Sequence, residues 1–431
     1  MELRVCRANR ISGEITVPGD KSISHRAVML ASISEGITRV QGFSPGKDCL
    51  STVRCFKQMG VHIEDTGPGE VRIHGAGLYG LKEPEDILDA GNSGTTMRLL
   101  LGILAGQPFF SVVTGDHSLR RRPMDRVINP LRLMGAEIWG RNQGSLAPVA
   151  VSASEKLLPI EYSSPIPSAQ VKSAVLLCGL FTEGLTTVSE PVLSRDHTER
   201  MLGWFGADVH RYGDGRTVSI KGRPVLRGGQ LKIPGDISSA AFFIAAGCLL
   251  PGSEILIANV GINPTRSGII RTLKEMGADI ALLNKREECG EPVADLLVRQ
   301  APLHGVEISG RHLPSLIDEI PILAVAATQA KGTTVIRDAA ELRLKETDRI
   351  KAVALELGRM GASITETPDG LIIEGPVSLK GTVCLSHGDH RIAMSLAIAG
   401  LIAEGETIIR DSGIIEISFP GFREKLEQVL S

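Results

Sequence analysis

The chain has 431 residues, of which 42 % are hydrophobic and 22 % charged, and its formal net charge is −2. This length allows a large buried core and predicts two or three domains. The near-zero charge gives no electrostatic argument for binding nucleic acid or an anionic membrane, and an aromatic content of 3 % argues against a stacking platform for bases.

The N-terminal residues 1–17 alternate like a strand and lack the apolar region of a signal peptide, and apolar runs such as AAFFIAAGCLL are too short to span a bilayer. The seven cysteines are scattered and never spaced as CxxC, so we expect neither a disulfide framework nor a zinc site. The ten histidines show no ligand spacing, and we predict no metal and no cofactor. The expected location is the reducing cytoplasm.

An internal repeat runs along the whole chain. Six times an apolar run with helical character ends at a glycine and is followed by a short strand rich in β-branched residues. The glycines are separated by 68 to 80 residues and are Gly36, Gly106, Gly184, Gly252, Gly332 and Gly405. Because the six runs are apolar on nearly all sides, we predict helices buried inside a domain.

Each repeat continues with an amphipathic helix that ends at a glycine suited to a left-handed cap, followed by alternating strands that predict a hairpin. The sixth repeat stops after its second helix, so we expect the N-terminal strands to complete it. The tripeptide Pro-Gly-Asp occurs at 18–20 and at 234–236, with three repeats between. We predict that the chain crosses there between a discontinuous domain, 1–19 with 235–431, and an inserted domain, 20–234.

The loops before the apolar helices are rich in Ser, Thr, Asn and Asp, and helix capping explains most of these residues. Helix N-termini also attract anions, however, and several of these loops and of the loops after the strands add cations. These cations are Lys21, Arg26, Arg98, Arg120, Arg121, Arg122, Arg195, Lys345, Arg349 and Arg391. Since arginine suits bidentate binding of carboxylate and phosphate, we predict a pocket for more than one anionic group.

Nucleotide-binding loops do not explain these features. The run from Gly42 to Asp48 is one residue shorter than a Walker loop and has Asp where Ser or Thr binds magnesium. The run from Gly91 to Gly94 is not GxGxxG.

Two carboxylates accompany the cations. Asp318 is predicted to begin the fifth buried helix, where capping is the simpler explanation. Glu346 lies in the charged run RLKETDR, where a surface ion-pair cluster is equally plausible. A carboxylate among fixed cations stays ionised and can act as a base, and Lys21, if crowded by Arg26, would have a lowered pKa and could carry a proton.

Seven segments together carry a family resemblance. PGDKSISHRA, AGNSGTTMRLL, TGDHSLRRRPM, PSAQVKSAVLL, SRDHTERML, LKETDRI and GDHRIAM resemble the 5-enolpyruvylshikimate-3-phosphate synthase family, in order and over residues 10–425. The resemblance implies an α/β fold of two domains, each an inside-out α/β barrel of three βαβαββ repeats with buried helices. It also implies that the domains close over the substrates.

The resemblance further implies transfer of the enolpyruvyl group of phosphoenolpyruvate to the 5-hydroxyl of shikimate 3-phosphate, with release of phosphate, in the shikimate pathway. It makes Lys21, Asp318 and Glu346 the catalytic residues. The residues implied to bind shikimate 3-phosphate are Lys21, Ser22, Arg26, Ser168, Ala169, Gln170, Arg195, Asp318 and Lys345. Those implied to bind phosphoenolpyruvate are Lys21, Gly94, Arg122, Gln170, Arg349 and Arg391.

Some positions depart from the common family pattern. Glu416 and its neighbours replace a lysine that many members carry before Thr-Phe-Pro. Leu99, Ala169 and the pair Arg195-Asp196 are similar to the second class of the family, which is associated with tolerance of glyphosate. Tolerance in that class is tied to an alanine at the position of Gly94. We therefore expect this chain to be more sensitive to glyphosate than relatives that carry the alanine.

Two other functions stay open. A UDP-N-acetylglucosamine enolpyruvyl transferase shares the fold, but it carries a reactive cysteine in a loop that corresponds to 114–123, where this chain has none. A repeat scaffold that binds an anionic partner without turnover is the alternative outside the enzymes. For the enzyme we expect two small-molecule substrates as partners, no nucleic acid, no membrane and a monomer.

Overall fold

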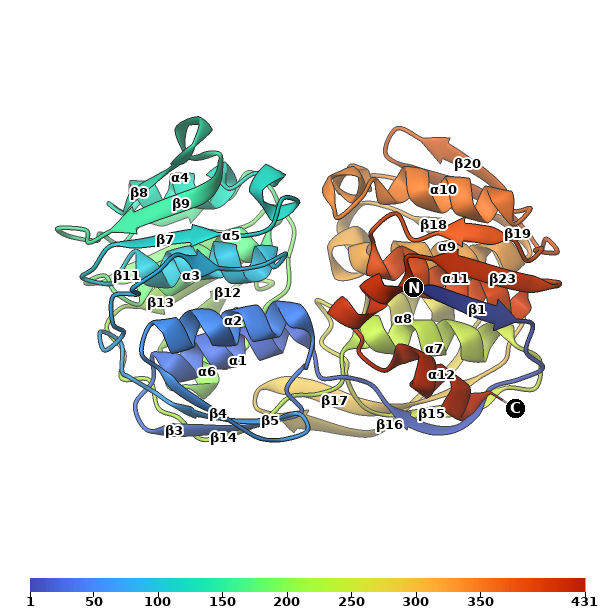
Figure 1. The fold of residues 1–431 in the computed structure, drawn as a ribbon, viewed down its shortest axis with the longest axis horizontal. Coiled ribbons are helices and arrows are strands. Elements are labelled where there is room, and N and C mark those ends of the chain that lie inside the picture. Colours follow the sequence, from blue (N-terminus) through green and yellow to red (C-terminus); the bar gives the residue numbers. More distant parts are fainter. Residues whose placement is uncertain (431) are drawn as a thin grey trace. The chain divides into compact units, whose positions relative to one another are not determined.

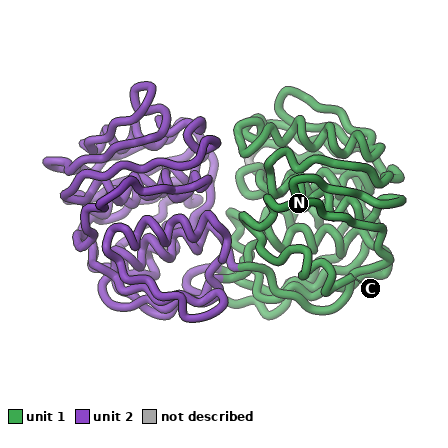
Figure 2. Tube along the Cα trace, viewed as in Figure 1, with its two compact units in different colours: residues 1–18, 234–286, 292–431 green, residues 19–233, 287–291 purple. Residues whose placement is uncertain are grey.

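The computed structural model describes residues 1–430, apart from the side chain at position 311, and its contacts divide the chain into two compact units (Figure 2). Unit 1 comprises 1–18, 234–286 and 292–431, and unit 2 comprises 19–233 and 287–291. The chain changes unit after Pro18 and after Ile233, beside the two Pro-Gly-Asp turns. Residues 287–291 group with unit 2, whereas the sequence analysis had included them in the discontinuous domain.

The six apolar runs are helices within the described part of the chain, and almost every residue in them is buried. They are α1 (Lys21–Ser32), α3 (Gly94–Leu104) and α5 (Ala169–Gly179) in unit 2, and α7 (Ile237–Leu249), α9 (Ile320–Gln329) and α11 (His390–Ile402) in unit 1. Figure 1 shows the strands of each unit around its three buried helices. The prediction of buried helices that are apolar on nearly all sides is confirmed.

The second helix of each repeat is amphipathic. These helices are α2 (Lys47–Gln58), α4 (Asp125–Leu133), α6 (His197–Trp204), α8 (Gly268–Glu275), α10 (Arg349–Arg359) and α12 (Phe422–Val429). The stop predicted after them is seen at Gly60, with φ of 82°, and at Gly135, with φ of 91°. Glycine adopts this left-handed conformation without a steric penalty, so the helix ends there and the chain turns into the next strand.

When the strands are numbered by their position in the repeat, each four-stranded sheet of unit 2 has the order 1-2-4-3. Strands 1 and 2 are parallel, and the other neighbouring pairs are antiparallel. The first sheet contains β14 (Gln230–Lys232), β3 (Ile37–Gln41), β5 (Glu70–His74) and β4 (His62–Gly67). The second contains β6 (Leu88–Asp89), β7 (Ser111–Thr114), β9 (Leu146–Ser152) and β8 (Glu137–Arg141). The third contains β10 (Glu161–Ser163), β11 (Leu185–Ser189), β13 (Thr217–Lys221) and β12 (Val209–Tyr212). This order is the βαβαββ repeat.

Unit 1 repeats the pattern. One sheet contains β2 (Ser12–Thr16), β15 (Glu254–Gly261), β17 (Glu291–Arg299) and β16 (Asp279–Glu288). Another contains β18 (Glu307–Ile308), β19 (Gly332–Ile336), β21 (Gly370–Gly375) and β20 (Ser363–Thr367). The last contains β22 (Val383–Leu385), β23 (Glu406–Arg410) and β1 (Glu2–Cys6). Since β1 pairs antiparallel with β23, the N-terminal strand completes the sixth repeat as expected, with one strand.

The two crossing segments exchange strands between the repeats. β2 precedes α1 in the chain but pairs in parallel with β15 of unit 1, and β14 precedes α7 but pairs in parallel with β3 of unit 2. The first and fourth repeats therefore each receive their first strand from the segment that leads into the other unit. The two-domain α/β fold with three repeats per domain is the predicted fold class.

Short 3-10 helices occur in several of the connecting loops. They are η1 (Leu119–Arg121), η2 (Asn142–Gly144), η3 (Gly310–Ser315), η4 (Ile317–Glu319), η5 (Ala340–Leu344) and η6 (Ser412–Ile417). All seven cysteines are free thiols. Across residues 1–430, no helix has both the length and the apolar character that a membrane crossing requires.

The hairpin tip at 287–291 is bound to α6 by polar contacts. Glu291 accepts a 2.8 Å contact from the Nδ1 side of His197, and Arg200 donates to the carbonyl of Gly290 at 2.8 Å. Burial lowers the pKa of His197, but the charge and hydrogen bond of Glu291 outweigh it and raise that pKa. These buried polar contacts join the tip to unit 2.

Two helical glycines give a matched test of this packing. A methyl group at Gly102 would lie 2.3 Å from the carbonyl oxygen of Ala174, because α3 and α5 are in close contact, whereas nothing lies within 4 Å at Gly203. We predict that Gly102→Ala lowers the free energy of unfolding by about 1–3 kcal/mol. Gly203→Ala is expected to raise it by up to about 1 kcal/mol. Urea unfolding of both variants checks the two signs, and equal effects would contradict the packing argument.

Candidate functional site

The predicted site residues of unit 2 gather at the N-terminal turns of α1, α3 and α5. Side-chain oxygens cap all three helices: Asp20 accepts from the backbone of Ile23 at 2.9 Å, Ser93 from Thr96 at 3.1 Å and Ser168 from Val171 at 3.4 Å. Ser168 is thus a cap, and the neighbouring Ala169 is the first residue of α5. Such ends carry partial positive charge from free N–H groups.

Gln170 joins the N-terminal turns of α3 and α5. Its amide oxygen accepts hydrogen bonds from Arg98 at 2.8 Å and from Arg126 at 3.5 Å, and its amide nitrogen donates to the hydroxyl of Thr95 at 3.4 Å. Two guanidinium groups therefore meet at the amide oxygen of Gln170. The sequence analysis noted Arg98 as a cation but did not assign it to either substrate, and it had not singled out Arg126.

Arg122 reaches the same place from the loop after β7. It donates to Asn92 at 2.9 Å and to Ser118 at 3.3 Å. A methyl group on Gly94 would lie 3.0 Å from a terminal nitrogen of Arg98 and 3.7 Å from one of Arg122. The structure thus brings Gly94, Arg122 and Gln170 together, and the absence of a side chain at Gly94 leaves room for the guanidinium group of Arg98.

Lys21, the first residue of α1, forms an ion pair with Asp48 in the first turn of α2. The side chain of Lys21 is 25 % exposed and that of Asp48 is 11 % exposed. The sequence analysis expected crowding by cations instead, and it considered Asp48 only as a defect in a Walker-like loop. Asp48 lies beside Lys21 because α1 packs against α2. No local sequence pattern reveals this packing.

Arg26 lies behind these groups and is almost completely buried. It donates to the hydroxyls of Thr198 at 2.6 Å and Ser173 at 2.9 Å and to the carbonyl of Ser22 at 2.9 Å. Burial lowers the pKa of its guanidinium to about 10, although the charge of Glu199 acts in the opposite direction. The charge of Arg195 also lowers this pKa, so Ser22, Arg26 and Arg195 occupy one region.

A fully buried ion triad of Lys172, Glu190 and Glu199 stabilises this region. The ammonium of Lys172 lies 2.6 Å from Glu190 and 2.8 Å from Glu199, and it also contacts the carbonyl of Ser194 at 3.5 Å. Burial lowers the pKa of Lys172, but the charges of Glu199 and Glu190 outweigh it and raise that pKa. The triad fixes the residue next to Arg195. Sequence reasoning had treated Lys172 only as part of an apolar helix.

A chain of hydroxyls connects α1, α2 and α3. His25 Nδ1 and the Thr52 hydroxyl are 2.7 Å apart, and the hydroxyls of Thr52 and Thr96 are also 2.7 Å apart. Thr96 donates in turn to the capping oxygen of Ser93 at 2.8 Å. His25 is fully buried, and burial lowers its pKa to about 3. The imidazole is therefore neutral in the folded chain, and the network holds the turn that begins at Gly94.

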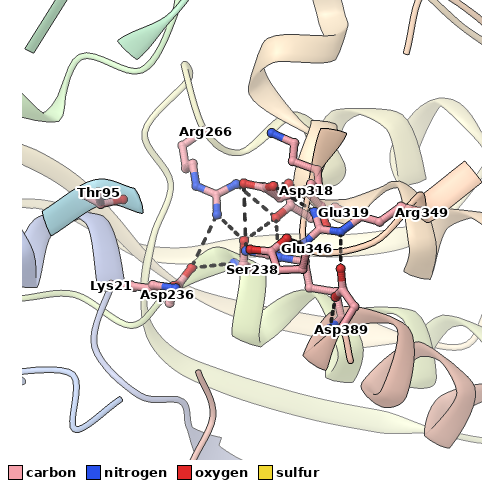
Figure 3. Close-up of polar contacts among 12 residues, drawn as sticks. Lys21, Thr95, Asp236, Ser238, Arg266, Asp318, Glu319, Glu346, Arg349 and Asp389 are labelled. Carbon is pink, nitrogen blue, oxygen red and sulfur yellow. Dashed lines mark hydrogen bonds and ion pairs between the residues drawn. The ribbon is translucent and has the colours of Figure 1, made fainter. Parts of the chain in front are cut away.

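In unit 1 the buried guanidinium of Arg349 binds three carboxylates (Figure 3). It contacts Asp389 at 2.7 Å, Glu346 at 2.7 Å and Asp318 at 3.2 Å. Burial lowers the pKa of Arg349, but the charges of Asp389, Glu346 and Asp318 outweigh it and raise that pKa. The two carboxylates predicted to transfer protons thus share one fixed cation.

Asp318 does not begin the fifth buried helix. It lies in η4, and α9 starts at Ile320 without a side-chain cap. Its carboxylate contacts Arg349 and lies 3.9 Å from Arg391, which also donates to the backbone carbonyl of Asp318 at 3.2 Å. The capping explanation for Asp318 is therefore wrong, and its side chain is available to the charged cluster.

A second group of residues, missed from the sequence, extends this cluster. Arg266 binds both oxygens of the buried Glu319, at 3.0 and 3.1 Å, and it also contacts the hydroxyl of Ser238 and, at 3.8 Å, Asp236. Figure 3 shows these contacts beside Asp318. One feature of the sequence indicates this group. Asp236 and Ser238 belong to the polar segment before the fourth apolar run, where capping residues were predicted.

Lys345, another predicted residue of unit 1, forms an ion pair with a residue outside this cluster. Its ammonium pairs with Glu341 at 2.7 Å, within the same loop. The carboxylates around Arg349 also outnumber the guanidinium groups that bind them. Unit 1 consequently offers mainly fixed carboxylates, whereas the sequence analysis had emphasised its cations.

Comparison with known proteins supports one reading of this arrangement. Residues 5–426 match the family model described as EPSP synthase (3-phosphoshikimate 1-carboxyvinyltransferase). The 3-phosphoshikimate 1-carboxyvinyltransferases of Desulforamulus reducens and Pelotomaculum thermopropionicum are 56 % and 58 % identical to the chain. The alignments cover 100 % of this chain in both cases and 100 % and 99 % of the relatives.

Solved structures agree. EPSP synthase from Acinetobacter baumannii superposes with a TM-score of 0.90 at 46 % identity, covering 100 % of this chain and 98 % of that one. The enolpyruvyl transferase NikO from Streptomyces tendae superposes with a TM-score of 0.80 at 20 % identity, covering 99 % and 97 %. At that lower identity the likeness shows the fold alone.

The buried His25 gives a pH-dependent prediction. Its pKa falls from 6.5 to about 3 on folding, so below pH 6.5 the unfolded chain binds a proton that the folded chain does not. Stability is therefore lost as the pH falls, and the loss levels off near pH 3. We predict that His25 alone makes the free energy of unfolding about 2 kcal/mol lower at pH 5 than at pH 8.

The measurement compares urea unfolding of wild type and His25→Gln at both pH values. The variant is expected to lose less stability on acidification, while His210→Gln, at an exposed position, should behave like wild type. An unchanged pH dependence in His25→Gln would show that the buried imidazole is not the source.

Proposed function

The chain belongs to the EPSP synthase family, and from this membership we infer that it is a 3-phosphoshikimate 1-carboxyvinyltransferase. It transfers the enolpyruvyl group of phosphoenolpyruvate to the 5-hydroxyl of shikimate 3-phosphate and releases phosphate. This reaction belongs to the shikimate pathway, which leads to chorismate and the aromatic amino acids. The enzyme is the kind that glyphosate targets.

One observation in the structure carries the mechanistic proposal: Asp318 and Glu346 both bind the guanidinium of Arg349. The reaction needs one group that takes the proton of the 5-hydroxyl and one that exchanges a proton with the methylene carbon. We propose Asp318 for the first role and Glu346 for the second. A shared buried cation keeps both carboxylates oriented before substrate arrives, so little reorganisation is needed during the reaction.

The steps balance without any further reactant. The methylene carbon of phosphoenolpyruvate gains a proton from the protonated form of Glu346, and the 5-hydroxyl oxygen bonds to the neighbouring carbon as its own proton passes to Asp318. The methyl group then returns a proton to the carboxylate of Glu346, the bond from carbon to the phosphate oxygen breaks, and phosphate leaves. We propose that Lys21, held by Asp48, assists proton transfer at the bridging oxygen.

The anionic groups of the substrates require cations. For shikimate 3-phosphate we propose the set Lys21, Ser22, Arg26, Ser168, Ala169, Gln170, Arg195, Asp318 and Lys345. For phosphoenolpyruvate we propose Lys21, Gly94, Arg122, Gln170, Arg349 and Arg391. The meeting of Arg98, Arg122 and the α3 N-terminus at Gly94 supports the second set, and Arg98 joins it on that ground. Closure of the domains over these substrates stays a prediction.

The two other functions have less support. A UDP-N-acetylglucosamine enolpyruvyl transferase is expected to carry a reactive cysteine in the loop that corresponds to residues 114–123, and this chain contains none there. A scaffold without turnover would not need two carboxylates held by one buried cation.

A coupled assay tests the function directly. Phosphate should be released from phosphoenolpyruvate only when shikimate 3-phosphate is present. Release with UDP-N-acetylglucosamine instead would favour the related transferase, and substrate binding without release would favour the scaffold.

The chain is proposed to act as a monomer in the cytoplasm. The free thiols suit a reducing compartment, and every proposed site residue comes from this one chain. Size-exclusion chromatography with light scattering checks the oligomeric state.

The role of Glu346 has a specific test. Glu346→Gln keeps the size of the side chain and an oxygen for Arg349 but cannot exchange the proton. We predict that kcat falls about 100-fold or more while the dissociation constant for shikimate 3-phosphate changes little. Glu366→Gln makes the same change at an ion pair with Arg343 and should leave turnover unchanged. Wild-type turnover in Glu346→Gln would remove Glu346 from the mechanism.

We also propose that the chain belongs to the second class of the family, on the basis of Leu99, Ala169 and Arg195. Gly94→Ala would place a methyl group 3.0 Å from a terminal nitrogen of Arg98. We predict that this variant raises the glyphosate concentration for half-inhibition about tenfold or more, since one methyl group can discriminate strongly in a tight pocket. Inhibition is measured at fixed phosphoenolpyruvate with KM determined for each variant, and Gly203→Ala is the control. Unchanged inhibition would contradict the steric argument.

A further inference from the structure

The hairpin of β4 and β5 places three metal-binding side chains on the outer face of its sheet. His62 lies directly opposite His74 in the antiparallel register, and Glu64 follows His62 by two residues, on the same face. The intervening Ile63 and the neighbouring Ile73 point the other way and are buried against the helices. The strand period therefore commits His62, Glu64 and His74, hereafter the hairpin triad, to the outer face.

The three side chains converge. His62 Nε2 lies 2.7 Å from a carboxylate oxygen of Glu64, His74 Nε2 lies 3.5 Å from the same oxygen, and the two imidazole rings are 4.9 Å apart. One ligand atom from each residue lies within 4.8 Å of the other two. This spacing matches the distances between ligands that surround one ion at about 2 Å from each atom.

An independent observation concerns His74. Its Nε2 is buried from solvent and makes no hydrogen bond to any residue that the structure describes. A ring nitrogen that is withdrawn from water and makes no hydrogen bond is unfavourable, and a bound ion would satisfy it. The nitrogen faces the carboxylate oxygen that also contacts His62, which is the centre of the triad.

We propose that the hairpin triad binds a divalent transition-metal ion of the zinc type. Two imidazoles and one carboxylate are a frequent three-ligand set for zinc, with a water molecule as fourth ligand, and the imidazoles select against magnesium and calcium. The residues belong to neither proposed substrate set, so this inference does not rest on the proposed function. The sequence analysis missed this site because His62 and His74 are twelve residues apart in the chain. The register of the hairpin brings them together.

Arg72 sets the strength of the site. It lies opposite Glu64 in the register, and its guanidinium binds the second carboxylate oxygen at 3.1 Å. This contact leaves the first oxygen directed at the imidazoles, but a cation so close also repels a metal ion. Arg72 is therefore a residue whose removal should strengthen binding, which a nonspecific surface effect of the histidines would not produce.

The test titrates the purified full-length protein with Co²⁺, whose visible absorption reports coordination, and then displaces it with Zn²⁺. We expect one equivalent to bind. His62→Gln and His74→Gln should each weaken metal binding about tenfold or more. Even the loss of a residue that only hydrogen-bonds to a metal ligand lowers metal affinity by about that factor. Arg72→Met should strengthen it. Turnover in the phosphate-release assay should be unchanged in all three variants.

Two controls separate other sources of metal binding. His210→Gln removes an exposed histidine that pairs with Asp208 alone, and it should bind Co²⁺ like wild type. Cys6→Ser and Cys289→Ser remove the thiols that are not fully buried, and they should also bind normally. Loss of binding only in the cysteine variants, absence of stoichiometric binding in wild type, or equal affinity in wild type and both histidine variants would each overturn the proposal.

Discussion

The charged cluster of unit 1 depends on one buried guanidinium. Arg349 binds Asp389 just before α11, Glu346 in the loop before α10 and Asp318 in η4, so three segments far apart in sequence meet at one side chain. Breaking a buried ion pair by removing one partner typically costs about 3–5 kcal/mol. That cost restrains all three loops. The proposed proton-transfer groups are therefore held in place by the same interaction that stabilises this end of the unit.

The two units share a repeat but differ in charge at equivalent places. In unit 2 the neutral Ser93 and Ser168 cap α3 and α5, and the carboxylate of Asp20 caps α1. In unit 1 the carboxylates of Asp236 and Asp389 cap α7 and α11, whereas α9 has no side-chain cap. Asp236 lies 3.8 Å from Arg266 and Asp389 lies 2.7 Å from Arg349, so both charged caps of unit 1 are also paired with arginines. We infer that one fold supplies anion binding and proton transfer from different copies of the same element.

Close helix packing makes the unit 2 arrangement possible. The backbone of Gly102 in α3 approaches the carbonyl of Ala174 in α5 so closely that no larger residue fits. Because these helices run together, Arg98 on one reaches Gln170 on the other at 2.8 Å. The apolar core thus sets the distance between polar groups at the helix ends, and the buried chain from His25 to Ser93 fixes their orientation.

The sequence alone determined the repeat, the buried and amphipathic helices and the glycine stops, because these follow from local periodicity and backbone preference. The family resemblance added the fold class and the roles expected for Asp318, Glu346, Gly94 and Gln170, and these roles stay predictions. The tertiary structure decided the partners: Asp48 for Lys21, three carboxylates for Arg349, and His74 for His62 and Glu64. It also moved Asp318 out of the helix cap and kept Lys345 with Glu341. The reason is physical, since these pairs depend on helix packing and strand register between residues distant in the chain, and a single sequence fixes neither by inspection.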